Sequence, residues 1–178
     1  IVWIGFNLMS GGVFLTPRNL WNLSVQTAAI GVLATGMVLV IVTRNIDLSV
    51  GSLVAFVGMV MGAVQTEILP PLIGFDYPAT WAITLVVGIL LGTFIGAVQG
   101  YIIAYLSVPS FIVTLGGLLV WRGAAWWVAS GKTLAPLDTN FQIIGGGASG
   151  SIGATASWVV GVVACAGIVV GLLSGRRQ

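Results

Sequence analysis

Few side chains in this chain could carry out chemistry. It contains no histidine, one cysteine, four acidic residues and six basic residues. The acidic residues are far apart in the sequence, and Cys165 lies within an apolar stretch. A nucleophile–base pair, a thiolate–imidazole metal site or a pair of catalytic carboxylates cannot be assembled from this set. We therefore predict no catalytic residues, no metal site and no cofactor, and we expect that the chain is not an enzyme.

One short segment resembles part of a phosphate-binding loop. Ser130-Gly131-Lys132-Thr133 matches the end of that motif. The motif also requires a glycine five residues before Gly131 and a strand ahead of the loop. Position 126 is a tryptophan, and a membrane helix is expected ahead of the segment. We attribute the match to chance and predict no ATP binding of this kind.

The densest polar cluster is the segment Thr43–Ser52. Asp47 can accept backbone N–H bonds at the start of a helix, where its charge suits the positive end of the helix dipole, and Arg44 can pair with it. A capped turn accounts for these residues fully, and a fixed hinge beside a permeation path is the functional alternative. On physical grounds alone we favour the capped turn. The residues singled out in this junction are Arg44, Asn45, Asp47, Ser49 and Gly51.

Two other places combine polar groups with apolar surroundings. The turn that contains Ser107, Pro109 and Ser110 is either a plain reverse turn or a narrow gate at a membrane surface. Arg122 is the charge that lies well inside an apolar segment. Arg122 either marks a pathway or a buried partner, or its long side chain reaches the lipid headgroups. We weigh these alternatives about evenly.

The composition indicates that lipid surrounds these segments. The chain is 58% hydrophobic and 6% charged, whereas soluble domains carry about 25% charged residues. The net charge of +2 is small, and no basic run with interleaved aromatic residues is present, so nucleic acid is not expected as a partner. The predicted fold class is all-α, a polytopic integral membrane helical bundle in a lipid bilayer.

The charge-free windows predict about six transmembrane helices, because one crossing of the hydrocarbon needs about 20 residues. The window 77–121 is too long for a single crossing, and Pro109 marks the place where it turns back. The expected crossings are 1–15, which is truncated, 21–43, 48–66, 79–105, 110–129 and 156–173. They form a single transmembrane domain over residues 1–178, and both ends look cut, as expected for a fragment of a longer polytopic protein.

The membrane orientation follows from the basic residues. With Arg44 in the cytoplasm, Arg176 and Arg177 fall on the same side, and Arg18 and Lys132 fall outside. The turn at residues 107–110 is then cytoplasmic.

Glycine recurs every fourth residue along the fourth expected crossing, at Gly88, Gly92, Gly96 and Gly100. Such a strip lets a neighbouring backbone come close, which is a main source of helix association in lipid. We favour this packing role for the glycine strip. The functional alternative is that the helix faces formed by these glycines slide against their neighbours during a transport cycle.

The segment Thr43–Ser52 resembles the signature of the bacterial monosaccharide ABC importer permeases of the ribose, xylose and galactose type. The usual form reads Gly-Gly-Ile-Asp-Leu-Ser-Val-Gly-Ser, and Arg44 and Asn45 stand in place of its two glycines. Two further parts fit the family: Phe14–Leu20, and Val108–Gly117 with Trp121-Arg122-Gly123. The variants look most like xylose or multiple-sugar permeases, and the match covers the N-terminal half of such a protein.

The resemblance implies an ATP-driven importer of a monosaccharide, such as a xylose-like pentose, in the bacterial inner membrane. It implies a fold like that of the vitamin B12 importer permease, with the turn at 107–110 near the cytoplasmic gate. The implied partners are two copies of an ATP-binding subunit, an external sugar-binding protein, and a second permease copy. A weakly polar pathway would suit a sugar, and the available side chains are Gln26, Thr35, Gln65, Gln99, Ser107, Ser110 and Thr114.

Two other functions stay open. An ion-coupled secondary transporter usually carries ionisable relays at mid-membrane, and here Arg122 is the sole residue that qualifies. A non-transporting membrane scaffold is compatible with the polar junctions, although the signature does not predict it.

Overall fold

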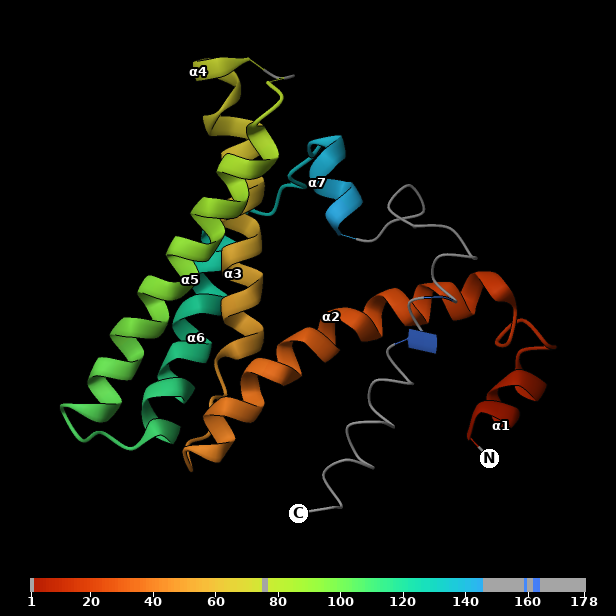
Figure 1. Ribbon diagram of the computed structural model, residues 1–178, viewed down its shortest axis with the longest axis horizontal. Coiled ribbons are helices and arrows are strands. Elements are labelled where there is room, and N and C mark those ends of the chain that lie inside the picture. Colours follow the sequence, from red (N-terminus) through yellow and green to blue (C-terminus); the bar gives the residue numbers. More distant parts are fainter. Residues whose placement is uncertain (1, 75–76, 146–158, 160–161, 164–178) are drawn as a thin grey trace. The chain divides into compact units, whose positions relative to one another are not determined.

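The structure is a computed structural model that describes residues 2–74, 77–145, 159 and 162–163. Regular structure in these residues is helical, as predicted. The elements are α1 (Val2–Met9), α2 (Pro17–Val42), α3 (Val50–Ala63), the π-helix η1 (Val64–Ile68), α4 (Pro70–Ile73), α5 (Thr80–Ala104), α6 (Ser110–Ala129) and α7 (Thr139–Ile144) (Figure 1).

The chain divides into two compact units, Ile1–Asp138 and Thr139–Gln178. The second unit contains α7, and the first contains the other helices named above. The single transmembrane domain expected over residues 1–178 stays a prediction.

Four helical segments of the described chain are long and apolar enough to cross a membrane. They are Pro17–Val42, Val50–Ile73, Thr80–Ala104 and Ser110–Ala129. Together they confirm a polytopic helical membrane protein. The crossing expected at 156–173 falls outside the described residues, apart from positions 159, 162 and 163.

The crossing expected over residues 1–15 is not one continuous helix. α1 has 8 residues, a length of about 12 Å at the helical rise. The chain then turns through Gly11 and Gly12, both of which have positive φ angles.

The third crossing runs beyond the predicted end at residue 66. α3 continues through η1 into α4, so one span reaches from Val50 to Ile73. Glu67 lies in the wider π-helical turns and does not end the helix. Pro70 is the first residue of α4, where a missing N–H is tolerated. A charge therefore made a poor marker for the end of this span.

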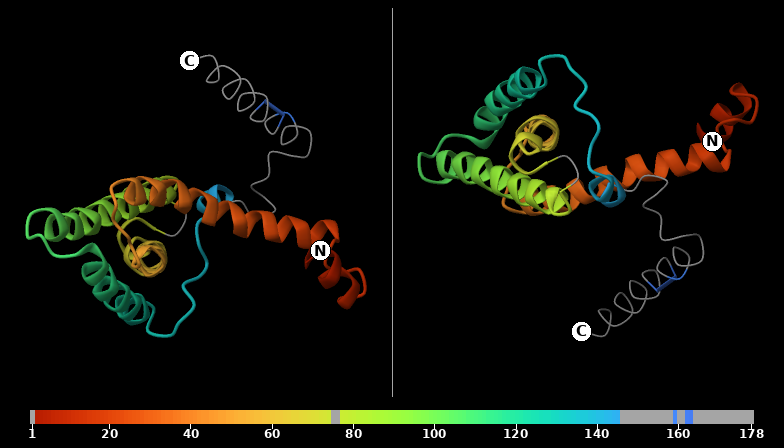
Figure 2. Two further views of the ribbon diagram at one scale, coloured as in Figure 1. Left: turned by 90° about the horizontal axis from the view of Figure 1, so that it is seen from below. Right: turned by 90° about the horizontal axis from the view of Figure 1, so that it is seen from above.

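α3 packs against α5 and α6 in the first unit, and the three helices lie side by side (Figures 1 and 2). Apolar and polar side chains are both buried in this unit. They are Ala63, Val64, Leu69, Ile95, Ala125 and Ala129, with the polar Ser49, Gln65, Thr80, Thr84, Gln99 and Thr114.

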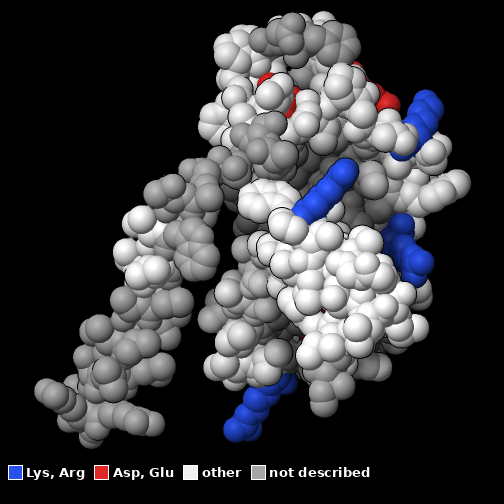
Figure 3. Space-filling view, turned by 90° about the vertical axis from the view of Figure 1, so that its right-hand side faces the viewer, with Lys and Arg blue, Asp and Glu red and all other residues white. Residues whose placement is uncertain are grey.

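Large apolar side chains cover the outside. Trp126 and Trp127 are 71% and 76% exposed, and Phe94 is 67% exposed. The face in Figure 3 is mostly uncharged, with separated basic side chains. Large apolar side chains on the outside and several polar ones inside are unusual for a soluble domain, and lipid as the surrounding solvent explains them.

The glycine strip of α5 meets a neighbour at one of its four positions. A Cβ on Gly88 would collide with the side chain of Met61 from α3. Nothing lies within 4 Å of a Cβ built on Gly92, Gly96 or Gly100. Close packing along the rest of the strip therefore stays a prediction.

Candidate functional site

The turn between α2 and α3 is built around a strained residue. α2 ends at Val42 with Thr43 as its cap, and Arg44 has a φ angle of 60°. This left-handed conformation favours glycine, because a side chain there costs about 1–2 kcal/mol. The usual form of the signature has a glycine at this position, and the backbone geometry gives a physical reason for it.

This strain leads to a testable prediction. We expect Arg44→Gly to raise the free energy of unfolding by about 1 kcal/mol, because it removes the Cβ that opposes the positive φ. Thermal unfolding of the protein at its full natural length, in detergent, measures the effect. Arg44→Ala is the matched control, because it removes the charge and most of the side chain but keeps the strain. An equal gain in both variants would show that the backbone is not the cause.

Asp47 holds the beginning of α3. Its Oδ1 accepts the Ser49 N–H at 2.7 Å and the Ser49 hydroxyl at 2.6 Å. Ser49 is the N-cap residue of α3, and its side chain is completely buried. Asp47 thus accepts a backbone N–H at the start of the helix, as expected from the sequence. The structure records no ion pair between Asp47 and Arg44, both of which are described.

Gln99 connects this turn to α5. It lies on α5, and its side-chain amide donates to the Ser49 hydroxyl at 3.3 Å. The Ser49 hydroxyl donates in turn to Asp47, so a buried chain of hydrogen bonds runs from Gln99 to Asp47. Gln99 is 9% exposed, and Gly117 of α6 packs closely against both Gln99 and Ser49. Three helices therefore meet at these polar groups.

The beginning of α6 touches the same turn. Ser110 is the first residue of α6, and its hydroxyl oxygen accepts the Ile46 N–H at 3.4 Å. The Thr114 hydroxyl lies 2.8 Å from the Ser110 carbonyl and 3.2 Å from the Ile46 carbonyl. Pro109 is the N-cap residue of α6, and no side-chain cap bond is present there. The Ser110 hydroxyl instead joins α6 to the turn between α2 and α3.

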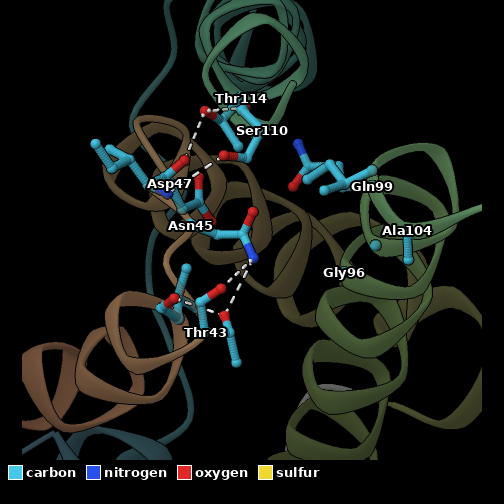
Figure 4. A pocket seen from close by; sticks show the side chains of 12 residues that line it. Thr43, Asn45, Asp47, Gly96, Gln99, Ala104, Ser110 and Thr114 are labelled. Carbon is cyan, nitrogen blue, oxygen red and sulfur yellow. Dashed lines mark hydrogen bonds between the residues drawn. The ribbon is translucent and has the colours of Figure 1, made fainter. Parts of the chain in front are cut away.

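A cavity of about 410 Å³ lies among these helix ends, and we call it the junction cavity. Its lining residues are Val40, Thr43, Asn45, Ile46, Asp47, Gly96, Gln99, Gly100, Ile103, Ala104, Ser110 and Thr114 (Figure 4). Figure 4 shows side chains from the turn, α5 and α6 around one space. The cavity combines hydroxyl, amide and carboxylate groups with apolar walls, a combination typical of small-molecule sites.

The structure brings together some of the predicted residues and leaves others apart. Asn45, Asp47 and Ser110 line the junction cavity, and Ser49 lies directly behind it. Ser107 has a φ angle of 54° in the turn before α6 and does not line the cavity. Gly51 lies in the first turn of α3, with nothing within 4 Å of a Cβ built there.

Arg122 lies away from this cavity. It is exposed on α6, and no ion pair with it is recorded in the described part of the chain. The alternative of a buried partner therefore has no support within the described residues. A pathway role for Arg122 stays a prediction.

Two features of the site were missed from the sequence. Gly96 and Gly100 line the cavity, and Gly117 lies where Gln99 and Ser49 meet. The Gly116-Gly117 pair within a helical segment was the available signal, because a glycine there usually has a packing reason.

The chain was compared with known proteins. A family model described as "Branched-chain amino acid transport system / permease component" matches residues 19–175. No solved structure matches the chain.

Three relatives are sugar permeases. The chain is 41% identical over 140 residues to the xylose transport system permease protein XylH of Escherichia coli (strain K12), covering 79% of this chain and 33% of that protein. It is 36% identical over 165 residues to XylH of Haemophilus influenzae, covering 93% and 41%. It is 38% identical over 128 residues to the ribose import permease protein RbsC of Escherichia coli (strain K12), covering 72% and 36%. The matches thus span 33% to 41% of the length of these relatives.

Proposed function

This chain belongs to the family of transport-system permease components that the xylose and ribose permeases represent, and we propose that it forms membrane-spanning helices of an ATP-driven monosaccharide importer. The transported solute in this proposal is a xylose-like pentose or a related sugar. The observation that carries the proposal is the 41% identity to a xylose permease over 140 residues. The family description refers to branched-chain amino acids, but the relatives that match at 35–41% identity are sugar permeases.

The charge of the junction cavity supports a neutral solute. Asp47 is the charged residue among its 12 lining residues, and no Lys or Arg is among them. An amino acid carries a carboxylate, which a cation usually binds. A sugar needs hydroxyl and amide partners, which the lining supplies.

The proposed assembly follows the resemblance of the signature. Two ATP-binding subunits act from the cytoplasm, an external sugar-binding protein delivers the solute, and a second permease copy completes the pore. The assembly lies in the bacterial inner membrane as a multi-pass protein.

We assign proposed roles to the residues of the two turns. The turn with Ser107, Pro109 and Ser110 lies near the cytoplasmic gate. The junction from Arg44 to Gly51 acts as a hinge, and its hydrogen bonds to α5 and α6 supply the coupling. These bonds support the assignment because they join the hinge and the gate turn through Ile46 and Ser110.

Purification of the protein at its full natural length from its native host tests the proposal. We expect an ATP-binding subunit to co-purify in mild detergent, with an ATPase rate that rises when the sugar-loaded binding protein is added. The complex with the sugar-free binding protein is the control. A protein that purifies without an ATPase, and that moves sugar along a proton or sodium gradient, would be a secondary transporter instead.

A further inference from the structure

We infer that the junction cavity is a contact site for the transported monosaccharide inside the permease, with Gly96 and Gly100 providing the space for the sugar ring. This inference rests on the proposed import function. It names the groups that hold the sugar within the membrane part, after the binding protein has released it.

Several polar groups in the cavity have hydrogen-bonding capacity left over. Oδ1 of Asp47 accepts both bonds from Ser49, and no bond to Oδ2 is recorded among the described residues. The Asn45 amide nitrogen donates to the carbonyl and hydroxyl oxygens of Thr43, so its own Oδ1 is left as an acceptor. The Ser110 oxygen accepts the Ile46 N–H, which leaves its hydroxyl hydrogen to donate.

These groups suit the hydroxyls of a sugar. A sugar hydroxyl donates one hydrogen bond and accepts others, so it can pair with a carboxylate or amide oxygen on one side and a hydroxyl on the other. Because Asp47, Asn45 and Ser110 come from two separate segments, they can hold one small molecule from more than one direction (Figure 4). The lack of a cation in the lining disfavours an anionic ligand.

The cavity also has room for a sugar ring beside α5. Gly96 and Gly100 lie one helical turn apart on α5, and both line the cavity. Nothing lies within 4 Å of a Cβ built on either glycine. A volume of about 410 Å³ falls within the usual range of small-molecule sites, about 300–1,000 Å³. Larger side chains at these positions would project into the space that a sugar ring would take.

The glycine strip supplies its own control. Gly92 belongs to the same strip and also has nothing within 4 Å of a built Cβ, but it does not line the cavity. Leucine at position 92 therefore tests the loss of a strip glycine without filling the cavity. Leucine at position 96 or 100 makes the same chemical change inside the cavity.

Saturation-transfer NMR on the protein at its full natural length, in nanodiscs, measures weak sugar contact directly. With xylose as the probe, we expect a signal for the unchanged protein and for Gly92→Leu, and its loss in Gly96→Leu and Gly100→Leu. Ribose serves as a second neutral probe. The free amino acid leucine serves as a zwitterionic probe, and we expect no signal from it. Gly96→Ala and Gly100→Ala give a smaller loss if the leucine variants do not purify in folded form.

The outcomes separate this inference from the proposed function. Equal xylose signals in the cavity variants and in Gly92→Leu would overturn the inference, as would an unchanged protein that imports sugar but gives no signal. In both cases ATP-driven uptake in vesicles would continue and the proposed function would stand. If the unchanged protein takes up no sugar with its ATPase and binding protein present, the proposed function itself fails.

Discussion

Gly117→Ala lowers the free energy of unfolding by about 1–3 kcal/mol, the usual cost of adding volume to a well-packed interior. A Cβ on Gly117 would lie 2.5 Å from Nε2 of Gln99, 3.2 Å from Cβ of Ser49 and 3.3 Å from Nε1 of Trp121. The Gln99 amide could move away, but it would then lose its bond to Ser49. The Ser49 Cβ can move only with the start of α3. The contact between α3, α5 and α6 must therefore loosen.

Gly116→Ala is the matched control. Gly116 precedes Gly117 on α6, and nothing lies within 4 Å of a Cβ built there. Both changes give the same gain in helix propensity, so the difference between them isolates the contact. Thermal unfolding of the full natural protein in detergent, followed by tryptophan fluorescence, measures the difference. If the two variants melt together, Gly117 is not a packing point.

The second large effect is expected at Asp47. Loss of a helix cap alone would cost about 1 kcal/mol. We expect Asp47→Ala to cost more, about 1.5–3 kcal/mol, because the fully buried Ser49 loses the acceptor of its N–H and the nearer acceptor of its hydroxyl, with Gln99 Oε1 left at 3.4 Å. Melting temperature in detergent gives the stability, and sugar uptake in vesicles should fall with it.

Asp47→Asn separates hydrogen bonding from charge. Asparagine keeps an oxygen where Oδ1 accepts from Ser49, so we expect most of the stability to return. Uptake by this variant then reports on the carboxylate charge in the junction cavity. A stable Asp47→Ala variant with unchanged uptake would remove Asp47 from both the fold and the proposed site.

Much of the fold was predictable, because length and charge limit where a membrane helix can lie. The break before α6 follows from Pro109, which is not compatible with a continuing helix at residue 108. The end of the third span was misplaced, since the sequence shows Glu67 but not the π-helical turns that carry it. The expected first crossing is interrupted for a local reason, the positive φ angles at Gly11 and Gly12.

The site was less predictable, because it depends on contacts between distant segments. Asp47 lies two residues before Ser49, and its role as a backbone N–H acceptor at the start of α3 could be predicted from residue type. The approach of Gln99 to Ser49 depends on how α3 and α5 pack, which no local pattern specifies. For the same reason, a regular glycine spacing could not distinguish Gly88, which meets Met61, from Gly96, which lines a cavity.

Uptake of labelled sugar into proteoliposomes tests the import function itself. The protein at its full natural length would be reconstituted with its ATP-binding subunit, and the binding protein would be supplied on the outer side. We expect labelled xylose or a related pentose to accumulate when ATP and the binding protein are both present, and omission of either one to stop it. Accumulation that follows a proton or sodium gradient in the absence of ATP would contradict the account.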